Sequence, residues 1–152
     1  MSKISHHQLT VVVCLIEKDN KILTLRRHDP EHAQWHQRWE FPGGKIELHE
    51  TPADAIRREV KEETNLTINS EKLLGVCTHH WNTPKGIQQT FILLYHCNDC
   101  VGEVHLDDQE NDIYSWEKPE DIILRTDFLD GNVKMFQDFF LDNASLNAVI
   151  PS

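Results

Sequence analysis

Short apolar runs alternate along the chain with polar, turn-forming segments, a pattern typical of an α/β domain. The aliphatic runs Thr10 to Glu17 and Lys21 to Arg27 flank Asp19-Asn20 and predict a β-hairpin. Apolar positions at 133, 136, 139 and 140 recur at helical spacing, which predicts a helix from about 132 to 141 with this stripe in the core. Further strands are expected at 66–68, 73–80, 86–96 and 113–116, with a turn at 82–86.

The clearest helix signal in the chain begins at Pro52. Thr51 supplies a hydroxyl N-cap, proline suits the first helical position, and Asp54 stands where a carboxylate can reach back to the cap. Residues 53–63 are mostly good helix formers, and Asn65 can adopt the left-handed conformation that ends a helix. A helix is therefore predicted from Pro52 to about Thr64.

Three carboxylates gather on one side of this predicted helix. At about 100° per residue, Glu59, Glu62 and Glu63 fall within one arc, while Ile56 and Val60 point to the neighbouring side. Like charges three and four residues apart repel, so a bound hard cation such as Mg²⁺ is a physical reason for clustering them. The alternative is a solvated acidic helix face without a ligand.

The residues around this helix form a longer motif. Gly44-Lys-Ile-Glu-Leu-His-Glu50 is followed, after seven residues, by Arg58-Glu-Val-Lys-Glu-Glu-Thr-Asn-Leu66. This motif resembles the Nudix box of the Nudix hydrolases at every fixed position but one, where Asn65 replaces a glycine. Both residue types tolerate positive φ. Residues 39–45, Trp-Glu-Phe-Pro-Gly-Gly-Lys, are similar to the MutT subgroup, and a looser resemblance runs from about residue 10 to residue 140.

The resemblance implies a fold and a metal site. The expected fold is one domain over residues 1–152, an α/β/α sandwich with a mixed β-sheet. Glu59, Glu62 and Glu63 would bind Mg²⁺ or Mn²⁺, and the carbonyl of Gly43 would be a further ligand. In the same resemblance, Gly44, Glu50 and Arg58 hold the loop and the helix in register.

The resemblance also implies a reaction. Family members cleave a nucleoside diphosphate linked to another group by attack of water on phosphorus, and a carboxylate accepts the proton. Glu59 belongs to the implied catalytic set, and Glu62 and Glu110 are the candidates for the general base. Glu110 stands six residues before Trp116, an interval that MutT-like chains share. Its acidic surroundings at 107–112 would otherwise indicate a solvated loop.

Substrate recognition is assigned by the same resemblance. Arg27, Glu40 and Phe41 are carried into the binding cleft, and Asn132 becomes a candidate for base recognition. Phe41 could instead be a core residue, and Asn132 could be the N-cap of the last helix. A nucleoside triphosphate is the expected substrate, cleaved to monophosphate and pyrophosphate. The alternatives are ADP-ribose or a nucleotide sugar, or a nucleotide-binding module without catalysis.

Composition narrows the range of partners. The chain has 152 residues, 39% apolar content and a formal net charge of -10. This length suits one domain with an ordinary core, and the negative charge argues against nucleic-acid polymers and anionic membranes. The sequence contains no apolar run of about 18 residues and no apolar leader, so a soluble, cytoplasmic monomer or homodimer is expected.

Cysteines and histidines offer weaker candidates for metal binding. Cys14 and Cys77 lie in strand-like runs and are expected to be buried thiols, while Cys97-Asn-Asp-Cys100 could be a zinc half-site or a turn between strands. Histidines at 28, 32 and 36 recur every four residues. The nearby Pro30 and polar neighbours favour a long loop over a helical metal-binding face.

Overall fold

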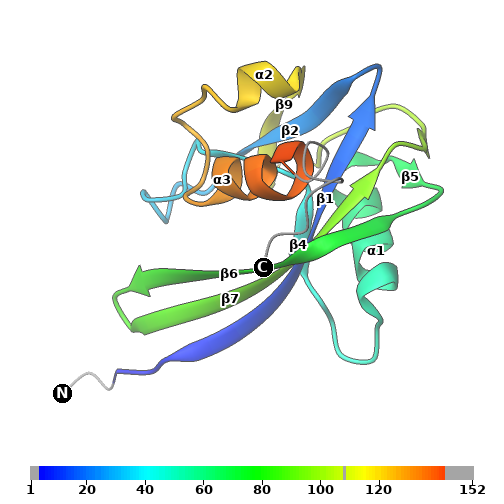
Figure 1. The fold of residues 1–152 in the computed structure, drawn as a ribbon. Coiled ribbons are helices and arrows are strands. Elements are labelled where there is room, and N and C mark those ends of the chain that lie inside the picture. The colour runs from blue at the N-terminus through cyan, green and yellow to red at the C-terminus, as the bar shows by residue number, and fades with distance from the viewer. Residues whose placement is uncertain (1–3, 108, 143–152) are drawn as a thin grey trace.

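The computed structural model describes residues 4–107 and 109–142 (Figure 1). Its strands are β1 (His7–Lys18), β2 (Lys21–Arg27), β3 (Trp39–Glu40), β4 (Gly43–Lys45), β5 (Thr67–Ile68), β6 (Lys72–Thr83), β7 (Gly86–Cys97), β8 (Cys100–Val101) and β9 (Asn111–Glu117). The helices are α1 (Pro52–Thr64), α2 (Pro119–Ile122) and α3 (Asn132–Phe136), and α3 continues into the π-helical segment η1 (Gln137–Leu141). Within the described ranges, no helix is long and apolar enough to cross a membrane.

A seven-stranded mixed sheet forms the centre of the molecule. Its order is β3-β2-β1-β7-β6, with β4 paired to β1 and β9 paired to β2. Strands β1 and β7 run parallel over ten residue pairs, and the other pairings in this sheet are antiparallel. Strand β1 pairs with β4 at Val11–Val13 and with β2 only at its last two residues. The sheet therefore opens between β1 and β2, and the β4 segment fills this opening.

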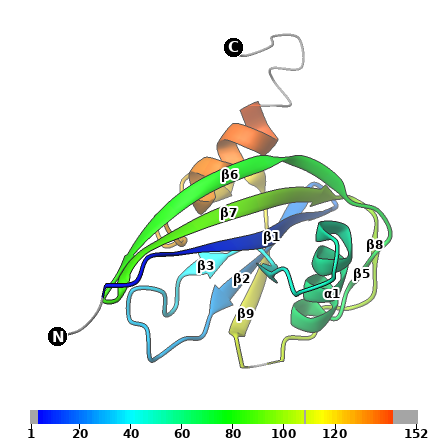
Figure 2. The same ribbon diagram turned by 90° about the horizontal axis from the view of Figure 1, so that it is seen from below.

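Helices cover both faces of the sheet, as Figures 1 and 2 show. On one face, Val12, Cys14 and Ile16 of β1 pack with Ala55, Ile56 and Val60 of α1 in one buried cluster. On the other face, Leu15 and Leu94 pack with Met135 and Phe136 of α3 in a second cluster. Alternate residues of β1 thus supply two cores, as the period of two in a strand requires. The predicted α/β/α sandwich with a mixed sheet is confirmed.

Local sequence signals predicted the hairpin and the first helix correctly. Asp19 and Asn20 take φ values of 53° and 62°, so both adopt the left-handed conformations that suit a two-residue hairpin turn. The amide of Asp54 donates a hydrogen bond to Oγ1 of Thr51 at 3.1 Å, and Asn65 ends α1 at φ 67°. Strand β1 begins three residues before the predicted Thr10.

The end of the described chain differs from the sequence prediction in two ways. The predicted helix from 132 to 141 is α-helical only to Phe136 and then π-helical. Gly131, at φ 83°, is the N-cap of α3, so the interpretation of Asn132 as the N-cap is wrong. Because Gly131 supplies the turn through its positive φ, Asn132 occupies the first helical position.

Candidate active site

A cleft of about 720 Å³ opens beside β1, β4 and β7. Four glutamates line it, namely Glu40 of β3, Glu59 and Glu63 of α1, and Glu110 just before β9. The other charged side chains that line it are Arg27, Asp29 and Lys45. Segments far apart in the sequence thus bring acidic groups to one cavity. The opening between β1 and β2 leaves room for the α1 carboxylates to lie beside β4.

The two glycines of β4 allow the α1 carboxylates to approach the backbone. A Cβ atom on Gly44 would lie 2.4 Å from Cδ of Glu59 and within 2.6 Å of both carboxylate oxygens. A Cβ on Gly43 would lie 2.2 Å from the carbonyl oxygen of Val12. The amide of Gly43 donates a hydrogen bond of 3.0 Å to Oε1 of Glu63. Side chains at these positions would displace the carboxylates or the strand.

Burial and mutual repulsion perturb the acidic groups in the cleft. Glu63 is 5% exposed, and burial, followed by the charges of Glu40 and Glu59, raises its pKa well above the ordinary value. Burial also raises the pKa of Glu59, and the charges of Glu62 and Glu110 add to this effect against the opposing Arg58. Such a concentration of incompletely compensated negative charge indicates a site for a cation.

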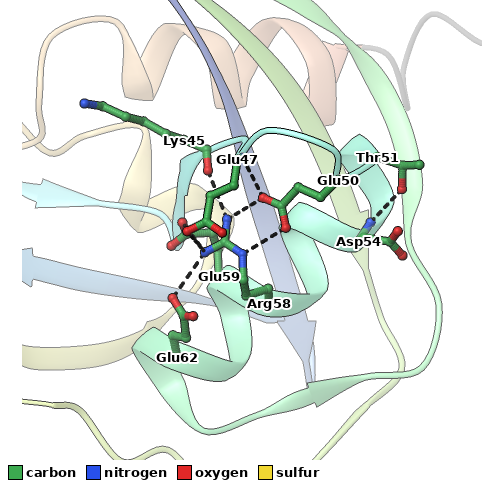
Figure 3. A network of polar contacts seen from close by, with 8 residues as sticks. All are labelled: Lys45, Glu47, Glu50, Thr51, Asp54, Arg58, Glu59 and Glu62. Atoms are coloured by element: carbon green, nitrogen blue, oxygen red, sulfur yellow. Dashed lines mark hydrogen bonds and ion pairs between the residues drawn. The ribbon is translucent and has the colours of Figure 1, made fainter.

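Arg58 binds the acidic loop and helix together (Figure 3). Its Nε and Nη2 atoms donate to the Glu50 carboxylate at 2.9 and 2.6 Å, and Nη2 also donates to the carbonyl of Lys45 at 3.1 Å. Its Nη1 atom donates to Glu59 at 2.9 Å and to Glu62 at 3.2 Å. The guanidinium therefore fixes the loop that precedes α1 against the helix face.

The Arg58 contact sets the charge state of Glu50. Hydrogen bonds from Arg58, and then from the backbone of Glu47, lower the pKa of Glu50 to about 2. The carboxylate and the guanidinium therefore both stay charged over the ordinary pH range, and their pairing is a permanent part of the loop.

Glu62 stands apart from the cleft lining. Its side chain is 60% exposed and pairs with Arg58, in contrast to the lining residues Glu59 and Glu63. Among the described residues, no group of three His, Cys, Asp or Glu side chains has the geometry to hold a metal ion. The donor set still fits a hard divalent cation, because carboxylate oxygens flank the space that Gly44 leaves open and lack a full complement of positive partners.

The residues expected to bind substrate meet in the same cleft. Arg27, Glu40, Phe41 and Asn132 all line it. Nη1 of Arg27 lies 3.6 Å from Oε2 of Glu40. Phe41 is 3% exposed and packs in the second core cluster, so its main contacts are with core residues.

Comparison with known proteins identifies the family. The model of the NUDIX domain matches residues 6–139. The chain belongs to the Nudix hydrolase family. It is 33% identical over 116 residues to a MutT-like protein from Streptomyces ambofaciens, a match that covers 76% of this chain and 67% of the relative.

Two further relatives carry names that state a substrate of their own. An 8-oxo-dGTP diphosphatase from Proteus vulgaris is 35% identical over 79 residues, which cover 52% of this chain and 67% of that protein. An ADP-ribose pyrophosphatase from Methanocaldococcus jannaschii is 39% identical over 89 residues, which cover 57% of this chain and 51% of that protein. Nudix hydrolases generally use divalent cations and act on small nucleotide substrates.

A solved structure supports the fold. The crystal structure of a MutT protein from Methanosarcina mazei Go1 matches with a TM-score of 0.78 and 24% identity, covering 90% of this chain and 95% of that one. At this coverage the shared fold accounts for most of the chain.

Sequence reasoning missed several groups of the Nudix cleft. Asn111 is 2% exposed and donates through Nδ2 to Oε1 of Glu40 at 3.1 Å. Asn111 holds Glu40 from outside the lining, whereas the cleft itself is also lined by Trp35, Trp81, Gln88 and Thr90. The alternation of β7 could have indicated Gln88 and Thr90, but the sequence carries no signal that brings the two tryptophans together.

The weaker metal candidates form ordinary contacts. His32 pairs with Asp29 at 2.7 Å, and His36 accepts the amide of Asp29 through Nδ1 at 2.9 Å, both in the long loop that was predicted. All four cysteines are free thiols, and Cys97 and Cys100 flank a turn between β7 and β8. Cys14 is buried as predicted, whereas Cys77 is only half-buried.

Proposed function

We propose that this Nudix hydrolase is a Mg²⁺-dependent pyrophosphohydrolase of a nucleoside triphosphate, with Mn²⁺ as an alternative cation. The products would be the nucleoside monophosphate and pyrophosphate. The observation that carries the proposal is the convergence of Glu40, Glu59, Glu63 and Glu110 in one cleft beside the backbone of Gly43 and Gly44. A polyphosphate can approach this acidic surface only together with a cation, because its own charge is negative.

Carboxylate and carbonyl oxygens of this chain would hold the cation. Glu59 and Glu63 flank the glycine backbone, the carbonyl of Gly43 completes a set of hard oxygen donors, and Glu62 joins them once its pairing with Arg58 is exchanged. A divalent cation bound there supplies Lewis-acid stabilisation of the charge on the phosphate oxygens.

Cationic side chains in the cleft would orient the phosphates. Arg27 and Lys45 line the cavity on the acidic side, and a guanidinium can bind two phosphate oxygens at once. The contacts of Arg27 with Glu40 and Asp29 hold the guanidinium in place before substrate arrives.

One carboxylate must accept the proton of the attacking water. We assign this role to Glu110, because it is exposed and lines the cleft, whereas Glu62 lies outside the lining and pairs with Arg58. An exposed carboxylate can pass the proton on to solvent.

A substrate panel tests the proposal. Release of pyrophosphate and phosphate is measured on nucleoside triphosphates, 8-oxo-dGTP, ADP-ribose and nucleotide sugars, with Mg²⁺ and with EDTA. Pyrophosphate release from a triphosphate that EDTA abolishes supports the proposal. Cleavage of ADP-ribose or sugars alone transfers the chain to the second substrate class, which the relative from Methanocaldococcus jannaschii favours. Absence of cleavage across the panel would favour a binding module.

A further inference from the structure

Two tryptophans from distant segments meet at one side of the cleft. Trp35 lies in the loop between β2 and β3, and Trp81 lies near the end of β6. Their ring centroids are 6.0 Å apart and the ring planes are inclined by 84°, so the two rings form a corner. Both line the cleft, and the proposed hydrolysis needs neither of them.

The two rings are not part of the packed interior. Both are only half-buried, and neither belongs to the two core clusters. The indole nitrogen of Trp35 is nevertheless buried, and it has no hydrogen-bond partner among the described residues. A buried indole N–H usually finds an acceptor. The N–H group of Trp35 is an exception, so the packing around this ring is incomplete among the described residues.

The sheet leaves this corner uncovered by helices. Trp81 pairs with Gln88 across β6 and β7, two residues beyond the pair of His79 with Thr90. The helix layer of α3 and η1 contacts β6 at Gly75, and the turn before α3 lies against His79. Trp81 and Gln88 lie farther along the strands, where the cleft continues, so their side chains are accessible from the cavity.

The corner and the carboxylates are separated by a suitable distance. Gly43 pairs with Val13 of β1, whereas Gln88, the partner of Trp81, pairs with His7, six residues or about 20 Å away at a strand rise of ~3.3 Å. The rings bridge part of this length, because the centroid of Trp35 lies 6.0 Å from that of Trp81. Arg27 lies between the two ends, since Nη1 is 3.6 Å from Glu40 and Cζ is 5.4 Å from the centre of a Trp35 ring. Arg27 thus connects the carboxylate end of the cleft with the Trp35 ring, so a nucleotide whose phosphates lie at the carboxylates can place its base at this ring.

We infer that Trp35 and Trp81 form the surface on which the nucleobase of the substrate stacks. The inference deepens the proposed function and rests on it for the position of the phosphates. A planar base stacks on one ring while its edge meets the other, and the amide of Gln88 provides a donor and an acceptor within the same part of the cleft. Stacking accepts any base, so this corner holds the base, whereas polar neighbours distinguish one base from another.

Kinetics of paired variants test the role of the corner. Trp81→Leu and Trp35→Leu each remove a stacking ring and should raise KM for a triphosphate roughly tenfold to hundredfold with kcat within about threefold. Trp81→Phe and Trp35→Phe keep an aromatic ring and should restore most of the affinity. An unchanged KM in both leucine variants, with circular dichroism and thermal unfolding like the wild type, would overturn the inference.

A binding measurement decides the inference even if no triphosphate is cleaved. In a Trp39→Phe/Trp116→Phe background only the two cleft tryptophans fluoresce, because the chain has four tryptophans. Nucleoside monophosphates should quench this fluorescence, whereas ribose 5-phosphate and pyrophosphate should not, with N-acetyltryptophanamide correcting for light absorption. Equal quenching by all three ligands, or quenching by none, would contradict base stacking. Selective quenching without hydrolysis of any triphosphate would reject the proposed reaction but would leave the base-stacking inference standing.

Discussion

Replacement of Glu63 by Gln should change stability and activity in opposite directions. Glu63 is 5% exposed and accepts the amide of Gly43 at 3.0 Å, while Glu40 and Glu59 lie near enough to raise its pKa. A glutamine of the same shape keeps an oxygen for this hydrogen bond but removes the buried charge. Without a cation, the substitution therefore relieves an electrostatic penalty.

The expected gain follows from the desolvation of the buried charge. Leaving a buried polar group without adequate partners costs on the order of 1 to 3 kcal/mol. For a chain of 152 residues, 1 kcal/mol shifts Tm by about 2 to 4 °C, so Glu63→Gln should raise Tm in EDTA by roughly 2 to 12 °C at pH 8. The difference in Tm between the wild type and the variant should also depend on pH.

The sign of the pH dependence follows from the raised pKa. The folded protein holds the Glu63 proton more tightly than the unfolded chain, so wild-type stability falls as pH rises above the ordinary carboxyl pKa of 4.5 and through the folded value. Glutamine carries no such proton. The two proteins should therefore differ little below pH 4.5, and the variant should become the more stable one as pH rises.

Magnesium should reverse this order. At 100 times its Kd, Mg²⁺ would stabilise the folded wild type by about 2.7 kcal/mol. The variant should gain much less, because glutamine offers the cation no negatively charged oxygen. Thermal unfolding at pH 5 and pH 8, with EDTA and with Mg²⁺, measures these effects. Glu103→Gln is the matched control, since Glu103 is exposed outside the cleft. A Glu63→Gln protein that melts at or below the wild-type Tm in EDTA at pH 8 would refute the reasoning.

Three further predictions concern other parts of the site. Glu110→Gln should lower kcat by about 10² to 10⁴ with Mg²⁺ affinity nearly unchanged, whereas Glu62→Gln should weaken Mg²⁺ binding; the reverse pattern in turnover and metal titrations would exchange the roles. Gly44→Ala places a Cβ about 2.4 Å from the neighbouring carboxylate and should reduce kcat by about 10²-fold with Tm nearly unchanged, because the far end of a flexible side chain can move; wild-type turnover would contradict this. The Glu50 carboxyl should titrate near pH 2 when followed by ¹³C NMR, and a midpoint near pH 4.5 would contradict this. The stabilisation from its contact with Arg58 should be fully present above pH 4.5 and lost as pH falls through about 2.

Helix α1 could be predicted almost to the residue because its signals are local. Thr51 caps the helix, proline starts it and Asn65 ends it, and these are interactions between neighbours in sequence. The hairpin at Asp19-Asn20 was equally predictable for the same reason. The mixed sheet itself came from the resemblance to Nudix hydrolases, since the parallel pairing of β1 with β7 joins segments about 80 residues apart.

The remaining features depend on tertiary contacts. The sequence arc grouped Glu62 with Glu59 and Glu63, but Glu62 is exposed and lies outside the cleft lining, although Arg58 donates to both Glu59 and Glu62. The π-helical turn of η1 sits where a Phe139 ring lies against Gly75 of β6, a contact that helical spacing alone does not encode. The tryptophan corner likewise arises from the register of β6 on β7.

The most direct test of the central claim is ³¹P NMR of the products formed from a nucleoside triphosphate. The acidic cleft with its cation should yield only the nucleoside monophosphate and pyrophosphate, and EDTA or Glu63→Gln should suppress both signals together. Formation of the nucleoside diphosphate and inorganic phosphate, or undiminished turnover in EDTA, would contradict the account.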